Sequence, residues 1–192
     1  MSRNLQAHIL DVASDLFYRQ GIKNTGVDAI VKAAGTTKMS LYKYFPSKDD
    51  LVLAHLEKSR KALRQRLFQG IEKYAEPKGK LLAIFDVFTE LQANPSFRGC
   101  PFINAAAEFA EEGSPVQQAA ADHSSSFRNL MAALARKAGI LQADELAGQL
   151  AMLIAGAMSS EQIQKGSGAM SNARKAAETL IDAALNDSSP LT

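Results

Sequence analysis

Apolar residues recur every three or four positions along most of the chain, which is the spacing of one face of a helix. The first segment shows it clearly, with Leu5, Ile9, Val12 and Leu16 in register. Val, Ile and Thr never gather in the alternating runs that are typical of strands. The long stretches between glycines and prolines are instead rich in Ala, Leu, Gln, Glu and Lys, which favour helices. The pattern predicts an all-α protein.

Glycines and prolines divide this pattern into about nine helices. Gly21 and Gly35 are placed to end the first two helices, and Pro46 ends a short third helix over about 37–44. A fourth helix is expected from Lys48 to about Tyr74. Five further helices follow, over about 78–94, 101–112, 115–138, 142–164 and 169–187.

Charge is unevenly distributed along the chain. Residues 1–66 carry twelve Lys or Arg and six Asp or Glu, a net charge of +6, whereas the whole chain carries only +2. A basic N-terminal third on an acidic body suggests a nucleic-acid-binding module, although a solvated helical surface explains the charge equally well. We expect a DNA-binding domain over residues 1–50 and a second helical domain over residues 51–192, with the fourth helix as a rigid link.

The two short helices joined at "AAGTTKMS" are typical of a helix-turn-helix. At 100° per residue, Leu41 and Phe45 define the buried face of the second helix, so that Met39, Ser40 and Lys43 point outward, where a major groove is read. Flanking hydroxyls and amines are expected on the phosphates, although for any single side chain packing is the alternative. The predicted DNA-binding residues are Thr25, Thr36, Thr37, Lys38, Met39, Ser40, Tyr42, Lys43, Tyr44 and Lys48.

Residues 5–51 resemble the N-terminal domain of the TetR/AcrR family of transcriptional regulators. The resemblance rests on "ILDVASDLFYRQGIKNTGVDAIVKAAGTTKMSLYKYFPSKDDL", which has the family's residues in their usual order and spacing. Gly26 departs from it, because the family usually has Thr or Ser there, and this puts more weight on Thr25 as a phosphate contact. Thr36 stands where Val is common, and Met39 where a small residue is common.

The resemblance implies that the C-terminal helices bind a small-molecule effector and form a homodimer. A palindromic operator has two half-sites, and each needs its own recognition helix, which favours dimerisation. Two sets of residues are candidates for these roles, and packing in the protein core is the alternative role for every residue in them. The candidates for the effector pocket are Phe85, Phe88, Cys100, Phe102, Phe109, Phe127 and Met131. The candidates for the dimer interface are Leu150, Ala151, Ile154, Ala155, Leu180 and Ile181.

Cys100 lies in "FRGCPFINAAAEF", which is similar to a segment of a TetR subgroup with members that respond to electrophiles or oxidants through this cysteine. Arg98 and the start of a helix before Pro101 would both favour the reactive thiolate. The alternative is a small buried apolar residue. A single cysteine excludes an intramolecular disulfide, and no apolar run is long enough to cross a bilayer or to form a signal peptide. We therefore expect a cytoplasmic protein without a membrane partner.

No catalytic constellation is present in the sequence. Its three histidines fall on separate predicted helices without metal-ligand spacing, and "GSGAM" follows no strand. We expect no enzyme, no metal and no cofactor. The sequence is interpreted as a ligand-responsive homodimeric repressor, released from a double-stranded DNA operator by a small-molecule effector or by modification of Cys100. The alternative is a ligand-independent architectural DNA-binding protein or an activator.

Overall fold

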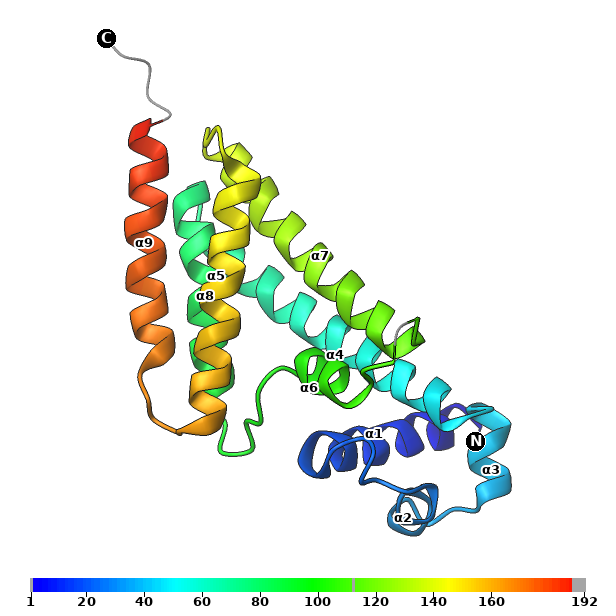
Figure 1. Ribbon diagram of the computed structural model, residues 1–192. Helices are drawn as coiled ribbons and strands as arrows, with labels where there is room; N and C mark the ends of the chain where they lie inside the picture. Colours follow the sequence, from blue (N-terminus) through cyan, green and yellow to red (C-terminus); the bar gives the residue numbers. More distant parts are fainter. Residues whose placement is uncertain (1, 112, 188–192) are drawn as a thin grey trace. The chain divides into compact units, whose positions relative to one another are not determined.

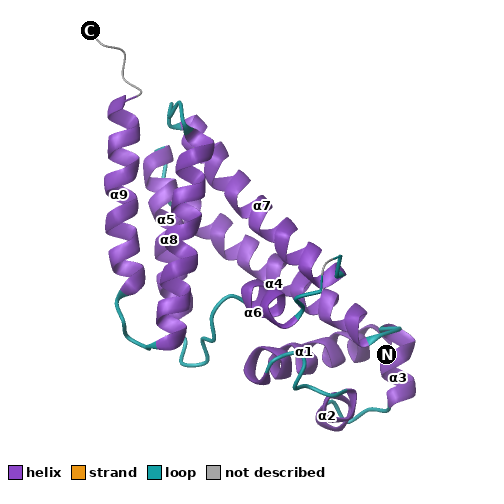
Figure 2. Cartoon of the chain, viewed as in Figure 1, coloured by secondary structure: helices purple, strands orange, loops and turns teal. Residues whose placement is uncertain are grey.

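The structure is a computed structural model that describes residues 2–111 and 113–187, with the side chains of residues 2–4 excepted. Within these ranges the chain forms helices and loops without a strand, which confirms the all-α prediction (Figure 2). Nine helices lie in the described part of the chain: α1 (Ser2–Gln20), α2 (Val27–Ala33), α3 (Lys38–Tyr44), α4 (Lys48–Ile71), α5 (Pro77–Gln92), α6 (Pro101–Glu108), α7 (Pro115–Lys137), α8 (Ala143–Ile163) and α9 (Ala169–Asp187) (Figure 1).

Most helix ends lie within one or two residues of their predicted positions. The main difference is α6, which was predicted to reach residue 112 but ends at Glu108; residue 112 itself lies outside the described residues. Glu108 and Glu111 provide a physical reason, because acidic side chains at the C-terminal end of a helix oppose its dipole. Helix α4 likewise ends at Ile71 rather than at about Tyr74.

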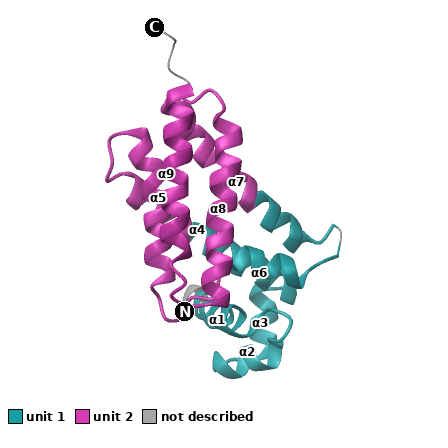
Figure 3. Cartoon of the chain, turned by 60° about the vertical axis from the view of Figure 1, so that its left-hand side comes forward, with its two compact units in different colours: residues 1–61, 101–122 teal, residues 62–100, 123–192 magenta. Residues whose placement is uncertain are grey.

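The helices group into two compact units that do not follow chain order (Figure 3). Unit 1 comprises residues 1–61 and 101–122, and unit 2 comprises residues 62–100 and 123–192. Helices α4 and α7 therefore contribute to both units, and α6 belongs with the helix-turn-helix. The functional boundary expected near residue 50 stays a prediction.

Unit 1 is built on a small core beneath the two short helices. Ile9 and Phe17 of α1 are buried together with Ile30 of α2. Leu41 of α3 and Phe45, which caps it, are also buried. These last two residues form the face that helical periodicity assigned to the interior, so the predicted orientation of α3 on its own domain is confirmed.

Unit 2 contains the larger core. Helices α5, α8 and α9 pack along one another (Figure 1). Phe85, Met131, Leu150 and Ile181 are fully buried among them and their neighbours. Burial of such side chains is the main stabilising contribution, at roughly 1.5–3 kcal/mol each.

Candidate nucleic-acid interface

Helix α3 begins with a side-chain cap at Thr37. The backbone of Thr37 is extended, and its Oγ1 accepts a hydrogen bond from the backbone N–H of Ser40 at 3.2 Å. The Thr37 hydroxyl also lies 3.1 Å from Oγ of Ser40. This cap fixes the N-terminal turn of α3, which is the part of a recognition helix that contacts base edges.

Of the three residues predicted to point outward from α3, Met39 and Lys43 are exposed and Ser40 is half-buried. Met39 is 84% exposed and Tyr42 is 43% exposed, and Lys43 is also exposed. In the described part of the chain Lys43 makes no ion pair. Tyr44, in contrast, is half-buried. Helix α3 thus presents Met39 and Lys43 on the side opposite its buried Leu41, with Tyr42 partly exposed on the flank.

Two hydroxyls predicted to contact DNA are less accessible than these side chains. Thr36 lies in the turn between α2 and α3 and is half-buried. Ser40 is half-buried as well, and its Oγ accepts the hydrogen bond from Thr37. The structure therefore places all members of the predicted set near α3 close together, but with unequal access to solvent.

Lys38 holds α3 to α2 through an ion pair. Its Nζ lies 2.8 Å from Oδ1 of Asp28, and both side chains are largely exposed. The hydrogen bond to Asp28, followed by the charge of the same carboxylate, raises the pKa of Lys38. A phosphate contact from Lys38 would have to replace this ion pair, which solvent screens because both side chains are exposed.

Of two further predicted phosphate contacts, burial argues against Thr25, whereas the contact of Lys48 stays a prediction. Thr25 is fully buried, and its hydroxyl donates to the carbonyl of Gly21 at 2.7 Å, so it cannot reach a phosphate. Nζ of Lys48 donates to the carbonyl of Ile22 at 2.7 Å. Both side chains therefore hold the loop between α1 and α2. Periodicity alone could not reveal this, because each role depends on where that loop folds back.

Comparison with known proteins identifies the family. The profile described as "Bacterial regulatory proteins, tetR family" matches residues 9–55, and the profile described as "Tetracyclin repressor-like, C-terminal domain" matches residues 77–177. The second match alone covers more than half of the chain. The chain belongs to the TetR family of bacterial regulatory proteins.

Individual relatives agree with this assignment. YxaF, an uncharacterised HTH-type transcriptional regulator of Bacillus subtilis, is 30% identical over 148 residues, which is 76% of each chain. LmrA, an HTH-type transcriptional regulator of the same species, is 28% identical over 113 residues, and the match spans only 60% of LmrA and 58% of this chain. The solved structure of SCO4454, a TetR-family regulator from Streptomyces coelicolor, has a TM-score of 0.85 at 27% identity, covering 97% of this chain and 96% of that one. These relatives are transcriptional regulators and not enzymes.

The candidate pocket residues of this TetR-family chain are distributed over both units. Phe88 and Phe127 meet edge to face in unit 2, with ring centroids 5.6 Å apart, and they pack with Phe85, Met131 and the half-buried Cys100. Phe102 and Phe109 belong to unit 1, with Phe102 buried and Phe109 half-buried. Their common role as an effector pocket stays a prediction.

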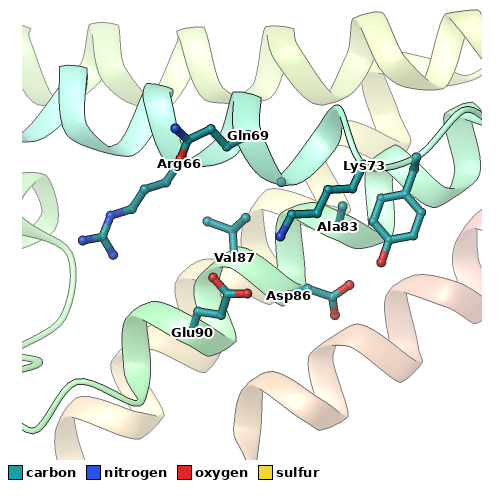
Figure 4. Close-up of a pocket in the computed structure, with 9 residues that line it drawn as sticks. Arg66, Gln69, Lys73, Ala83, Asp86, Val87 and Glu90 are labelled. Atoms are coloured by element: carbon teal, nitrogen blue, oxygen red, sulfur yellow. The ribbon is translucent and has the colours of Figure 1, made fainter.

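A cavity that the sequence did not predict lies in unit 2. It has a volume of about 260 Å³ and is lined by residues of α4, of the turn after it and of α5. Lys73 extends over α5 toward Val87 and the carboxylates of Asp86 and Glu90 (Figure 4). Asp86 is also paired with Arg174 of α9 at 2.8 Å. Arg66, Lys73, Asp86 and Glu90 make the lining largely charged, unlike the phenylalanines and methionine predicted to form an effector pocket.

The residues predicted for dimerisation separate into two groups. Leu150, Ile154 and Ile181 are buried in the core of unit 2 within one chain, where their side chains serve the protomer. The other three, Ala151, Ala155 and Leu180, are half-buried. Any contact with a second copy would therefore fall on this second group and on exposed neighbours such as Met152, which is not among the predicted interface residues.

The remaining expectations concern metals and membranes. Among the described residues no group of three or more His, Cys, Asp or Glu side chains is placed to hold a metal ion. No helix in the part of the chain that the structure describes is long and apolar enough to cross a membrane.

Proposed function

We propose that this protein is a ligand-responsive transcriptional regulator that binds a palindromic DNA operator as a homodimer through α3. The observation that carries the proposal is the division of α3 into two faces. Leu41 is fully buried, whereas Met39, Tyr42 and Lys43 are exposed beside a capped N-terminus. A methionine and a tyrosine exposed on a seven-residue helix suit contact with bases and the sugar-phosphate backbone.

The charge of the N-terminal segment supports the same conclusion. Residues 1–66 carry a net charge of +6 within a chain of +2. Such a local excess attracts DNA phosphates, and each phosphate contact releases counterions and makes affinity depend on salt. The family assignment supplies the partner, because the relatives are named as HTH-type transcriptional regulators.

The experiment measures binding to a duplex that the wild-type protein selects from a random double-stranded library. Lys43→Ala and Tyr42→Phe should each weaken binding about tenfold, since a good polar contact is worth roughly 1–3 kcal/mol. Lys175→Ala and Tyr74→Phe are matched controls in unit 2, where Tyr74 is 42% exposed, nearly as much as Tyr42. Unchanged affinity in both α3 variants would contradict the proposed orientation of α3.

The homodimer is proposed to form on an exposed face of α8. At 100° per residue, Gly148, Met152, Ala155 and Ile163 fall within roughly a quarter turn of each other. Met152 and Ile163 are both largely exposed. Small residues beside large exposed apolar ones allow two helices to approach closely and bury apolar surface, as a self-complementary interface requires.

Release from DNA is proposed to follow from effector binding in unit 2 or from modification of Cys100. The effector shifts the population toward a state in which the two copies of α3 no longer match the half-sites, which makes the protein a repressor. Cys100 is half-buried at the residue before α6. The Cys100→Ser variant should resist release by hypochlorite or quinones; release equal to that of the wild type would exclude the cysteine. This function places the protein in the cytoplasm.

A further inference from the structure

The loop between α1 and α2, residues 21–26, is held by a side chain from a distant part of the chain. Glu108, the last residue of α6, accepts two backbone hydrogen bonds from this loop. Its Oε1 accepts from the N–H of Ile22 at 3.0 Å, and its Oε2 accepts from the N–H of Lys23 at 2.6 Å. The carboxylate therefore binds two consecutive amides of a segment that lies 85 to 86 residues away in sequence.

Two further side chains hold the same loop, one from α4 and one from within the loop itself. Lys48, the first residue of α4, donates to the carbonyl of Ile22 at 2.7 Å. Thr25 donates to the carbonyl of Gly21 at 2.7 Å. The backbone of Ile22 is thus paired on its N–H side with α6 and on its carbonyl side with α4, and its side chain is buried.

The geometry of Gly21 shows how closely Glu108 approaches the loop. Gly21 has a φ of +89°, a conformation that L side chains rarely adopt. A Cβ placed on it would lie 3.2 Å from Oε1 of Glu108, tighter than nearly all such contacts. Next to it, the ammonium of Lys23 lies 5.9 Å from the ring centroid of Phe109. The loop and the end of α6 therefore fit together through several adjacent contacts within unit 1.

We propose that Glu108 is a positioning residue for operator binding, and that α6 sets the orientation of the helix-turn-helix through it. The inference rests on the proposed function and deepens it. Residue 26 at the end of this loop is the cap of α2, so the loop determines where α2 begins and, through the turn at Gly35, where α3 lies. Glu108 acts without touching DNA, by keeping the loop in the arrangement that presents α3.

The chemistry predicts which substitutions matter. A carboxylate can accept from both amides, and hydrogen bonds to a charged group are stronger than those between neutral groups. In Glu108→Gln one of the two oxygens becomes an NH₂ group, which faces a backbone donor and cannot accept. If the fraction of protein with the loop in place falls to about a tenth, apparent operator affinity falls about tenfold, since it scales with that fraction.

The test compares full-length wild type, Glu108→Gln and the matched control Glu111→Gln on the duplex selected by the wild type. Glu111 is exposed and lies three residues further along the same segment. Three quantities are measured at a temperature where each protein is folded: operator affinity, its dependence on salt, and hydrogen exchange at the amides of Ile22 and Lys23. Lys43→Ala is run alongside.

Glu108→Gln should weaken binding about tenfold with an unchanged salt slope, because it removes no phosphate contact. Its two loop amides should exchange faster, and Glu111→Gln should match the wild type in all three measurements. Lys43→Ala should instead lower the salt slope by about one.

Faster exchange without loss of affinity would overturn the proposal and leave Glu108 a purely stabilising residue. Loss of affinity with unchanged exchange would overturn it too, because the loop would not be the cause. If Lys43→Ala weakens binding and Glu108→Gln does not, only this proposal fails. If the wild type selects no duplex at all, the proposed function fails and this proposal fails with it.

Discussion

Gly70 of α4 lies directly against Val87 of α5, so close that a Cβ placed on Gly70 would overlap Cγ2 of Val87. Both residues also line the charged cavity of unit 2 (Figure 4). The contact thus determines how closely α4 and α5 approach at the cavity.

Gly70→Ala should lower the free energy of unfolding, although alanine favours a helix over glycine. The added methyl group forces a shift of Val87 or of a helix, and overpacking of this kind costs about 1–3 kcal/mol. In a Val87→Ala background the same change should be neutral or stabilising, because the obstructing methyl group is gone. Urea unfolding of the four proteins of this double-mutant cycle measures the difference. Equal effects of Gly70→Ala in both backgrounds would show that the helices do not meet here.

Thr25→Val tests whether the Thr25 hydroxyl contacts a phosphate. Valine keeps the shape of threonine but removes the hydroxyl that donates to Gly21, so unfolding should become easier by about 1–3 kcal/mol. The salt slope of operator binding should stay at the wild-type value, since a fully buried hydroxyl neutralises no phosphate. Thr25→Ser, which keeps the hydroxyl, is the control. If Thr25→Val lowers the salt slope of operator binding and Thr25→Ser does not, the Thr25 hydroxyl contacts a DNA phosphate after all.

His55 of α4 should make the stability of unit 1 depend on pH. Its ring is buried edge-on against Phe17, with centroids 5.7 Å apart, and its Nδ1 has no hydrogen-bond partner among the described residues. Burial lowers the pKa of His55 to about 4, and the charge of Lys58 acts in the same direction.

Between about pH 6.5 and pH 4 the unfolded chain therefore binds a proton that the folded chain does not. Stability is fully present above the unfolded pKa and falls as pH drops through this window, by on the order of 3 kcal/mol. Urea unfolding at pH 7.5 and pH 4.5 measures the loss. In His55→Leu, which cannot titrate, this part of the pH dependence should disappear. An equal loss in both proteins would assign it to carboxylates instead.

The parts of this fold that the sequence predicts are those set by local pattern. The buried pair Leu41 and Phe45 followed from helical spacing, and the cap at Thr37 from its place before a short helix. The parts that were missed depend on contacts distant in sequence. Lys48 was interpreted as a phosphate ligand at a helix start, and only the folded chain shows its ammonium on the carbonyl of Ile22.

Dependence on contacts distant in sequence also explains why the role of Glu108 was not predicted. In sequence it is one acidic residue near the end of a predicted helix, and no periodicity connects it to a loop 86 residues earlier. The charged cavity was missed for a related reason, because it depends on the close approach of Gly70 to Val87. Leu150 was predicted as a dimer contact, but it is buried within the protomer. Helical periodicity alone could not decide between these two places.

Met152→Glu should convert the homodimer to a monomer if the exposed face of α8 forms the interface. Met152 is 68% exposed in the protomer, so the substitution leaves the core of unit 2 intact, but in a dimer it would bury an unpaired charge. Phe68→Glu is the matched control. Phe68 lies on α4 and is 63% exposed, so this substitution removes an apolar side chain of similar exposure.

Sedimentation velocity should show a monomer for Met152→Glu and a dimer for Phe68→Glu, with both proteins folded. Operator affinity of the monomer should fall by about 10²-fold or more, because the second half-site no longer binds at high effective concentration. A dimer of Met152→Glu as stable as the wild type would place the interface elsewhere. The half-site spacing would then have to be set by a different pair of helices.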